Sequence, residues 1–328
     1  MQNQPLVSII TPGYNCGAVV HRLLDSILAQ TWQNIEFIFV NDGSTDNTAE
    51  VLDSYREKFA ARGIEYTIIT QDNHGVGCAV QTGLKAFHGD YLCWPDADDY
   101  LEPDSIAVRA EYLEQHSDYG CVTGQAVVRK VPSFEQVWVW GNDVAFESAQ
   151  DHFERLLHRN TVFCCGCHMI RTSYFLKINP EREIYPSRHG QNWQMLLPMY
   201  YHYKRGFIAK PVYNYLLFPN SMSREKLSAE KRLEQLEAYY TIQQETLKRI
   251  TFKDKSELEK YNRIVTYEHG SDLLIYARDY KLKAYAKQAK ELMIKEGLFD
   301  QRLKRLYREA TNPVYAFILR QYRKLMMK

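Results

Sequence analysis

The chain has 328 residues, of which 45% are hydrophobic and 25% are charged, as is typical of a globular protein with one or two domains. Its 41 Lys and Arg residues nearly balance 40 Asp and Glu residues, and the net charge of +1 excludes the strongly basic character of a non-specific nucleic-acid binder. The 24 Tyr and 14 Phe residues exclude disorder over most of the chain, because so many apolar rings do not stay solvated.

The sequence predicts a protein of the cytoplasm. No apolar run approaches the roughly 20 residues that span a bilayer, and residues 1–15 lack the basic stretch that opens a signal peptide. The seven cysteines are an odd number in a chain without a recognisable export signal, so we expect reduced thiols rather than a disulfide framework.

Strand and helix patterns alternate over the first hundred residues. Short apolar runs predict strands at residues 6–10, 35–40, 66–69 and 91–94. Apolar residues at helical spacing predict helices at residues 19–28, from 45 onward and at 76–87. Apolar strands separated by amphipathic helices indicate an α/β fold with a mainly parallel central sheet, whose ligands bind beyond the carboxyl ends of the strands.

The remainder of the chain has a different pattern. It predicts an antiparallel strand pair at residues 121–131 and 134–140, a further strand at 161–170 and a helix at 190–202. From about residue 227 the pattern is helical almost throughout. We therefore expect an α/β domain over residues 1–225 and a helical region over residues 226–328.

The last 28 residues combine apolar and basic side chains. They hold eight basic residues against a single acid, Glu309. Two interpretations stay open. The segment packs as a helix on the rest of the protein, or it makes peripheral contact with an anionic membrane surface on the cytoplasmic side, where each Lys or Arg contributes about 1 kcal/mol.

Polar segments follow three of the predicted strands, at the edge where a ligand is expected. They are residues 11–15, 41–46 and 95–99. The last segment contains Asp96, Asp98 and Asp99, and three carboxylates so close together repel one another unless a cation lies nearby. Oxygen ligands of this kind suit Mg²⁺ or Mn²⁺, which binds one or two carboxylates together with phosphate oxygens. A solvated acidic turn before a helix is the alternative.

Four motifs, in the order in which they occur, resemble those of family-two glycosyltransferases. They read VSIITPGYN, IEFIFVNDGSTDNT, QDNHGVGCAVQTGL and GDYLCWPDADDYLEP, and the resemblance covers roughly residues 5–220. It implies a GT-A fold and the transfer of a sugar from a nucleotide diphosphate donor, with inversion at the anomeric carbon. The implied acceptor is a glycan or a lipid-linked sugar, as in the assembly of bacterial surface polysaccharides.

The resemblance also implies roles for individual residues. Pro12 and Tyr14 would flank the nucleoside, with Tyr14 against the base, and Asp42 would accept a hydrogen bond from the base edge, which suits uracil. Asp98 would bind the metal ion, with Asp99 close by. The remaining donor contacts would come from Gln71, Asn73, Gly75, Asp96 and Ala97, and from Arg224, which would reach the diphosphate.

The motif that usually supplies the catalytic base differs in this chain. An inverting transfer needs a carboxylate to accept the proton of the acceptor hydroxyl, yet the segment that carries it in the family reads HGQNWQ here, with Asn192 in place of Asp. Three interpretations stay open. In the first, Asn192 and Gln191 orient the acceptor while the proton goes to His189, Glu183 or the Asp98/Asp99 pair. In the others, the reaction needs little base, or the chain binds the donor without turnover.

We therefore expect a metal-dependent glycosyltransferase that uses a uridine diphosphate sugar. A nucleotidyltransferase is one alternative, but such enzymes usually carry Arg and Lys in a glycine-rich loop after the first strand, and residues 11–17 contain neither. A nucleotide-sugar-binding protein without activity is the other, and Asn192 favours it. The sequence does not identify the sugar, the acceptor or the linkage, and nothing in it indicates a nucleic-acid partner.

Overall fold

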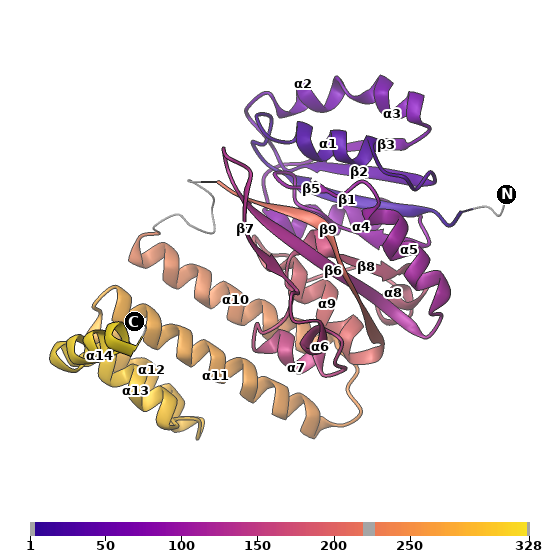
Figure 1. The fold of residues 1–328 in the computed structure, drawn as a ribbon. Coiled ribbons are helices and arrows are strands. Elements are labelled where there is room, and N and C mark those ends of the chain that lie inside the picture. The colour runs from indigo at the N-terminus through magenta and orange to yellow at the C-terminus, as the bar shows by residue number, and fades with distance from the viewer. Residues whose placement is uncertain (1–3, 219–226, 327–328) are drawn as a thin grey trace. The chain divides into compact units, whose positions relative to one another are not determined.

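The computed structural model describes residues 4–218 and 227–326. The chain folds into two compact units, Met1–Arg224 and Glu225–Lys328 (Figure 1). The first unit is a mixed α/β domain, and the second consists of helices. Across the described ranges, none of the helices is both long enough and apolar enough to cross a membrane.

One nine-stranded sheet organises the first unit (Figure 1). Its strands are β1 (Val7–Gly13), β2 (Ile35–Asn41), β3 (Glu65–Thr70), β4 (Tyr91–Cys93), β5 (Tyr100–Leu101), β6 (Tyr119–Lys130), β7 (Glu135–Trp140), β8 (His168–Arg171) and β9 (Lys204–Leu217). They run in the order β3-β2-β1-β4-β8-β6-β9-β5, and β7 pairs with β6. The first four strands are mutually parallel, whereas β8 is antiparallel to both β4 and β6.

Helices cover both faces of the parallel half of the sheet. The helices in the described part of the first unit are α1 (His21–Leu28), α2 (Thr48–Asp53), α3 (Arg56–Arg62), α4 (Val76–Ala86), α5 (Ser105–Gln115), α6 (Val144–Glu147), α7 (His152–Leu157), α8 (Thr172–Ile178) and α9 (Gln191–His202). Ile9 and Ile10 are neighbours on β1, so their side chains point to opposite faces, and both are fully buried. Ile9 belongs to the same apolar cluster as Leu23 of α1, while Ile10 lies against Gly83 of α4.

The predicted strand at residues 161–170 is wrong over most of its length. Within this range the strand β8 begins only at His168, because Cys165–Cys167 form a 3₁₀ turn. The fully buried guanidinium of Arg109 holds this turn by donating hydrogen bonds to the carbonyl oxygens of Gly166 (3.0 Å) and His168 (2.8 Å). The apolar run matches the pattern of a strand, but the hydrogen bonds from the buried Arg109 of α5 stabilise a turn in the backbone here instead.

Two further differences from the sequence pattern concern the first unit. The helix predicted from residue 45 is divided into α2 and α3. The long strand β9 was not predicted, and it is stabilised by pairing along almost the whole of β6. Pairing between strands that are remote in the sequence leaves no local pattern, so only the tertiary structure reveals it.

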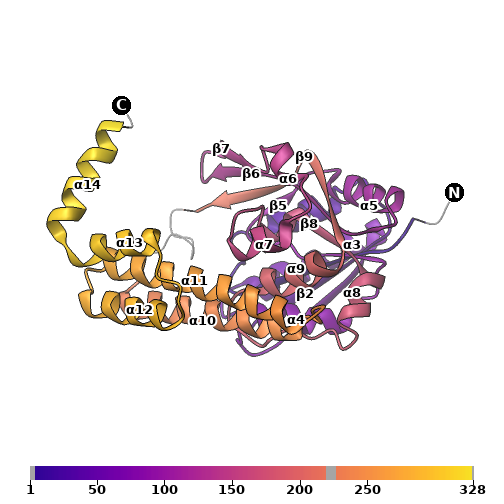
Figure 2. The ribbon, with the colours of Figure 1, turned by 90° about the horizontal axis from the view of Figure 1, so that it is seen from below.

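The second unit contains helices joined by short turns. They are α10 (Ala229–Arg249), α11 (Lys255–Asp279), α12 (Lys283–Lys295), α13 (Gln301–Thr311) and α14 (Pro313–Met326). Asp254 and Asp300 cap α11 and α13 by accepting hydrogen bonds from backbone N–H groups of the first turn. An apolar cluster that includes Leu274, Met293 and Leu303 joins α11, α12 and α13. Figure 2 shows α14 leading away from the end of α13 instead of lying along the other helices.

Candidate functional site

The carboxyl ends of β1, β2 and β3 lie level with one another. The register pairs Gly13 with Asn41, and Asn41 with Thr70. The loops that follow these strands therefore begin at one edge of the sheet, which we call the carboxyl edge. Pro12 is buried just before this edge, and Tyr14 just beyond it is 51% exposed. Ligands of parallel α/β sheets bind at such an edge.

The loop after β1 is fixed by hydrogen bonds to the loop after β2. The Asn15 side-chain oxygen accepts a hydrogen bond from the backbone N–H of Thr45 (2.8 Å), and the backbone N–H of Asn15 donates to the Ser44 hydroxyl (2.9 Å). Asn15 has a φ of 49°, a left-handed conformation that asparagine tolerates. The exposed ring of Tyr14 is therefore held on a rigid corner, where it can stack against a planar group.

Asp42 connects the loop after β2 to the loop after β3. Its carboxylate accepts hydrogen bonds from the Gln71 side-chain amide (2.7 Å) and from the backbone N–H groups of His74 (3.0 Å) and Gly75 (2.8 Å). The residue is only 3% exposed. A carboxylate has about four acceptor positions, so these partners occupy most of them and leave about one for a ligand. The main role of Asp42 in the structure is to shape the loop that contains Asn73.

A segment before α9 packs on the same loop. The Arg188 guanidinium donates hydrogen bonds to the side-chain oxygen (2.8 Å) and the carbonyl oxygen (3.2 Å) of Asn73. Gly75 makes this approach possible, because a Cβ atom there would lie 2.4 Å from the Cα of Arg188. Gly75 also has a φ of +93°, which L-residues rarely adopt. The packing brings His189 and Gln191 to the carboxyl edge.

His189 and Gln191 flank the start of α9. His189 is half-buried, and its burial together with the positive charge of Arg188 lowers the pKa of its imidazole. The ring is therefore neutral near pH 7 and can accept a proton. Gln191 is buried in the first turn of the helix.

Three carboxyl groups lie close together just after β4. Burial and the neighbouring Asp98 raise the pKa of Asp96 to about 7, and burial also raises the pKa of Asp98. The Tyr213 hydroxyl accepts a hydrogen bond from the backbone N–H of Asp96 (3.1 Å) and ties this turn to β9. The charge of Asp98 also acts on the buried Cys16 thiol, whose pKa is raised to about 11 chiefly by burial. The motif therefore lies beside the loop after β1.

Asp99 differs from the other two because it is almost fully buried. One carboxylate oxygen accepts a hydrogen bond from the backbone N–H of Leu216 on β9 (2.7 Å). The second oxygen is buried without a hydrogen-bond partner among the described residues. Burial, followed by the charges of Asp98 and Asp96, raises the pKa of Asp99 well above its ordinary value. Asp99 thus anchors β9, and Ala97 beside it is 6% exposed.

The carboxyl cluster fits a divalent cation. Burial raises the pKa of all three carboxyl groups, and a neighbouring carboxylate raises it further for Asp96 and Asp99. A bound cation would stabilise the ionised carboxylates and so oppose both effects. Over residues 4–218 and 227–326, no group of three His, Cys, Asp or Glu side chains is arranged to hold a metal ion. A cation bound here would therefore take its other ligands from water and from substrate phosphates, which is the usual manner of Mg²⁺.

Both the oxygen and the nitrogen of the Asn192 side-chain amide are hydrogen-bonded within the protein. Its oxygen accepts a hydrogen bond from the Trp94 indole (2.9 Å), and its nitrogen donates to the carbonyl oxygen of Phe163 (3.0 Å). Trp94 lies two residues before Asp96, so the amide braces the turn that carries the carboxyl motif. An Asp side chain would place a carboxylate oxygen against the Phe163 carbonyl. The Phe163 carbonyl oxygen therefore favours an amide, which can donate a hydrogen bond, over a carboxylate at this position.

Two other predicted residues do not join this group. Glu183 forms an ion pair with Lys85 (3.2 Å), nine residues beyond the first residue of α4. With a rise of about 1.5 Å per residue, Lys85 lies about 14 Å along α4 from the carboxyl edge, and its partner Glu183 is therefore remote from that edge. Arg224 lies outside the described residues. The other predicted residues gather at the carboxyl edge or in the turn after β4.

Sequence reasoning missed three residues that shape the site. They are Trp94, Arg188 and Tyr213, which contact Asn192, Asn73 and Asp96 respectively. Arg188 and Tyr213 lie outside the four motifs, and Trp94 lies within the fourth motif but carries no ligand-binding role there. Gly75 gave an indirect signal of the contact with Arg188, because a glycine before a helix indicates either a special backbone conformation or a close neighbour.

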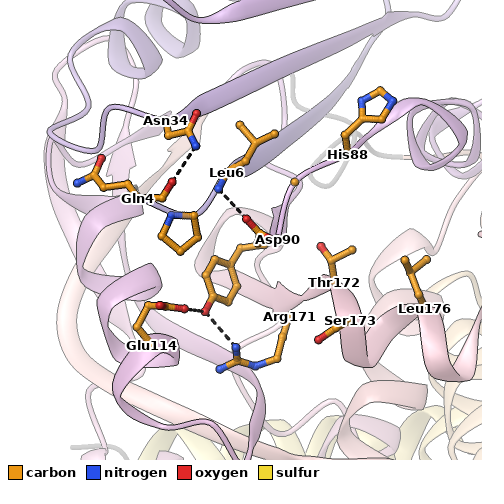
Figure 3. Close-up of a pocket in the computed structure, with 13 residues that line it drawn as sticks. Gln4, Leu6, Asn34, His88, Asp90, Glu114, Arg171, Thr172, Ser173 and Leu176 are labelled. Atoms are coloured by element: carbon orange, nitrogen blue, oxygen red, sulfur yellow. Dashed lines mark hydrogen bonds between the residues drawn. The ribbon is translucent and has the colours of Figure 1, made fainter. Parts of the chain in front are cut away.

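A pocket of about 560 Å³ lies at the opposite edge of the sheet, near the start of β1 (Figure 3). Asp90 accepts a hydrogen bond from the backbone N–H of Leu6 (2.9 Å), and Arg171 donates to the Tyr91 hydroxyl (3.1 Å), which also pairs with Glu114. Figure 3 shows these polar groups directed toward one another. The pocket is thus separate from the carboxyl edge, and its side chains Asp90, Arg171, Tyr91 and Glu114 are paired within the protein.

Comparison with known families identifies the first unit. The model of the family described as "Glycosyl transferase family 2" matches residues 8–178. An uncharacterized glycosyltransferase of Bacillus subtilis, EpsJ, is 39% identical over 112 residues, which are 34% of this chain and 31% of that protein. A chondroitin synthase of Pasteurella multocida is 36% identical over 118 residues, which are 36% of this chain and 12% of the relative. The chain therefore aligns with a third or less of each of these relatives.

Solved structures extend the similarity to most of the chain. Residues 1–349 of Staphylococcus aureus TarS in complex with UDP-GlcNAc give a TM-score of 0.61, with 15% identity, over 92% of this chain and 90% of that one. The mannosyltransferase PcManGT from Pyrobaculum calidifontis, in complex with GDP-Man and Mn²⁺, gives a TM-score of 0.56 with 14% identity, over 97% of this chain and 87% of that one. At such low identity, these structures confirm the GT-A fold.

The contacts of Asn192 predict that the Asn192→Asp variant is less stable than the wild type. The new carboxylate would face the Phe163 carbonyl and leave it without a donor, which should lower the free energy of unfolding by about 1–3 kcal/mol. Urea denaturation at pH 7 measures this difference. Asn34→Asp is the matched control, because the Asn34 amide donates to the Gln4 carbonyl oxygen in the same way but at the surface. Wild-type stability of the Asn192 variant would refute the proposed bracing role.

Proposed function

Because the chain belongs to glycosyl transferase family 2, we propose that it moves a sugar from a uridine diphosphate donor to a glycan or a lipid-linked acceptor, with inversion at the anomeric carbon. The observation that carries this proposal is the gathering of the donor motifs at one edge of the sheet. Tyr14, the Asp42-bound loop and the carboxyl cluster come from separate parts of the sequence and meet there.

In the proposed donor complex, the nucleotide lies along the loops after β1, β2 and β3. The exposed Tyr14 ring stacks on the base, and the remaining acceptor position of Asp42 takes the base N–H, which favours uracil. Asn73 and Gly75 face the nucleotide, with Pro12 and Gln71 behind them. Asp96 and Ala97 lie toward the ribose and the donor sugar. The UDP-GlcNAc bound in TarS supports this choice of donor class.

Asp98 is the residue that we propose as the metal ligand. Asp99 is buried and bonded to β9, so Asp98 is the better placed of the two to meet a substrate phosphate. When bound, Mg²⁺ or Mn²⁺ supplies positive charge that offsets the charge developing on the departing diphosphate. The Mn²⁺ in the PcManGT complex supports an ion of this kind.

We propose His189 as the general base. The acceptor oxygen forms a bond to the anomeric carbon, the bond from this carbon to the diphosphate oxygen breaks, and its electron pair leaves with the nucleotide diphosphate. The proton of the acceptor hydroxyl passes to the neutral imidazole. The Asn192 amide is hydrogen-bonded to Trp94 and Phe163. Glu183 pairs with Lys85 in the later part of α4, remote from the carboxyl edge. His189 is therefore the best-placed proton acceptor before α9.

We expect Asp98→Asn to abolish metal-dependent donor binding. Calorimetry with UDP should show that Mn²⁺ tightens binding to the wild type, whereas the variant should bind UDP equally with and without Mn²⁺. Asp53→Asn is the control, since the Asp53 side chain is 64% exposed on α2 and pairs with nearby Arg56. A screen of nucleotide sugars for hydrolysis with Mn²⁺ tests the donor. Full Mn²⁺ dependence in Asp98→Asn would remove this metal assignment.

The lowered pKa of His189 predicts the pH dependence of transfer. The neutral imidazole is the reactive form, so kcat at saturating donor and Mn²⁺ should fall as the pH drops below about 6.5, the ordinary pKa of histidine. His189→Gln should lower kcat by about 10²–10⁴-fold, lose this acidic limb and bind UDP normally. The control, His88→Gln, changes a side chain that is 73% exposed at the opposite edge. An unchanged pH profile in His189→Gln would exclude it as the base.

We also propose that α14 contacts the membrane that would carry a lipid-linked acceptor. Val314, Phe317, Ile318 and Tyr322 recur at helical spacing on one face of α14 and are 59–66% exposed. Lys304 and Arg308 of α13 are also exposed. Apolar side chains together with nearby basic charge are typical of helices that lie at an anionic lipid surface.

Phe317→Glu combined with Ile318→Glu should abolish co-sedimentation with vesicles that contain phosphatidylglycerol. Each substitution removes a large apolar side chain, whose burial contributes about 1.5–3 kcal/mol, and adds a negative charge. Ile294→Glu is the matched control, because Ile294 of α12 is 55% exposed but lies outside α14. Equal co-sedimentation of the double variant and the wild type would show that α14 does not bind lipid.

A further inference from the structure

Three aromatic side chains form a row that begins next to the carboxyl cluster. Tyr213, whose hydroxyl contacts Asp96, is two residues before Tyr215 on β9, so the two rings project from the same side of the strand. The ring centroid of Tyr215 lies 5.0 Å from that of Trp140, and Trp140 lies 6.1 Å from Trp138. We call Tyr215, Trp140 and Trp138 the aromatic strip.

The hairpin that carries the strip extends to the carboxyl edge. Phe134, at the turn between β6 and β7, has the Arg22 guanidinium of α1 5.5 Å from its ring centroid. Because α1 follows the loop after β1, this contact places the hairpin turn near the donor loops. Figure 1 agrees, since the tip of the β6–β7 hairpin lies beside the loops in which β1 and β2 end.

The strip offers rigid and partly open rings. Trp138 is 38% exposed, whereas Trp140 and Tyr215 are partly buried and pack against the main apolar cluster. Each ring therefore has a fixed orientation and part of its surface open to solvent. Tyr and Trp side chains supply large contact areas at low entropic cost because few torsions must be ordered.

We propose that the aromatic strip is the acceptor platform of this enzyme and binds a glycan chain by stacking pyranose rings on Trp138, Trp140 and Tyr215. The proposal rests on the proposed function, because it places the acceptor next to the carboxyl cluster where the sugar is transferred. A pyranose ring has an apolar C–H face that packs on an aromatic ring, and hydroxyl groups at its rim that stay solvated.

The strip differs from a surface that enters lipid. The apolar side chains of α14 are 59–66% exposed, whereas the exposed apolar residues of the hairpin, Phe134, Val137 and Trp138, are 37–49% exposed. Rings held half-buried in a row suit an elongated ligand that lies along them. Tyr213, two residues before Tyr215 on β9, is fully buried, and its hydroxyl bonds to the backbone of Asp96, so the Tyr215 end of the strip lies near the proposed reaction centre.

Tryptophan fluorescence provides a direct test. The chain has five tryptophans, and Trp32, Trp94 and Trp193 are at most 5% exposed, so a ligand that changes the emission must act mainly on Trp138 and Trp140. The probes are linear tetrasaccharides of glucose, galactose and N-acetylglucosamine, added to the full-length protein without donor. We expect at least one of them to shift the emission to shorter wavelength and, with donor present, to accelerate nucleotide diphosphate release.

Three variants separate the contributions. Trp138→Ala should remove the shift and raise KM for the active tetrasaccharide about tenfold, or 1.4 kcal/mol. Trp138→Phe keeps an aromatic ring and should restore KM to within about threefold of the wild type. Tyr285→Ala is the matched control, because the Tyr285 side chain of α12 is equally exposed at 37% but lies in the second unit.

Three outcomes would overturn the proposal. One is an unchanged KM in Trp138→Ala, and the second is the absence of any emission shift with all three tetrasaccharides while the donor is still hydrolysed. The third is a shift with anionic vesicles and none with sugars, which would assign the strip to a lipid surface. Failure of the proposed function is distinguishable, because no donor would be hydrolysed whereas the donor-free emission assay would still report glycan binding.

Discussion

The carboxylate of Asp42 is the point on which the carboxyl edge depends. A buried carboxylate is stable only when its oxygens are hydrogen-bonded, and here the backbone N–H groups of His74 and Gly75 and the amide of Gln71 meet this need. The same hydrogen bonds give the loop before α4 a single conformation. Arg188 can then approach Gly75 closely and bond to Asn73, which brings the segment before α9 to this edge.

Burial, together with repulsion between neighbouring carboxyl groups, determines what the carboxyl cluster can bind. The pKa values of Asp96, Asp98 and Asp99 are all raised, by burial in each case and by a neighbouring carboxyl group for Asp96 and Asp99. The buried arginines of this unit serve other partners: Arg109 donates to main-chain carbonyl groups, and Arg205 pairs with Glu147 at 2.9 Å. A cation that arrives with the substrate is therefore the natural counter-charge, which fits a donor that itself carries phosphates.

The sequence predicted the parallel half of the sheet well because each strand and helix there has a local apolar pattern. The predicted strands at 6–10, 35–40 and 66–69 correspond to β1, β2 and β3, and a helix was expected at α4. The error at residues 161–170 has a tertiary cause, the buried Arg109, and so does the missed strand β9, which depends on β6. The candidate site divides in the same way. Donor motifs lie in short loops after predicted strands, whereas Trp94 and Tyr213 act through partners about 100 residues or more away.

This division explains why the family pattern predicts donor chemistry better than acceptor chemistry. The donor side needs few residues, held by hydrogen bonds between loops that always follow β1, β2 and β3. The acceptor side that we propose consists of α9 and the β6–β7 hairpin, which reach the carboxyl edge through long-range packing. Asn192 illustrates the consequence, because its amide is fixed by Trp94 and Phe163 and so cannot be interpreted from its place in the motif alone. A proton acceptor and a glycan platform on this side must therefore be sought in the contacts of the folded chain, and it is on those contacts that our proposals for His189 and Trp138 rest.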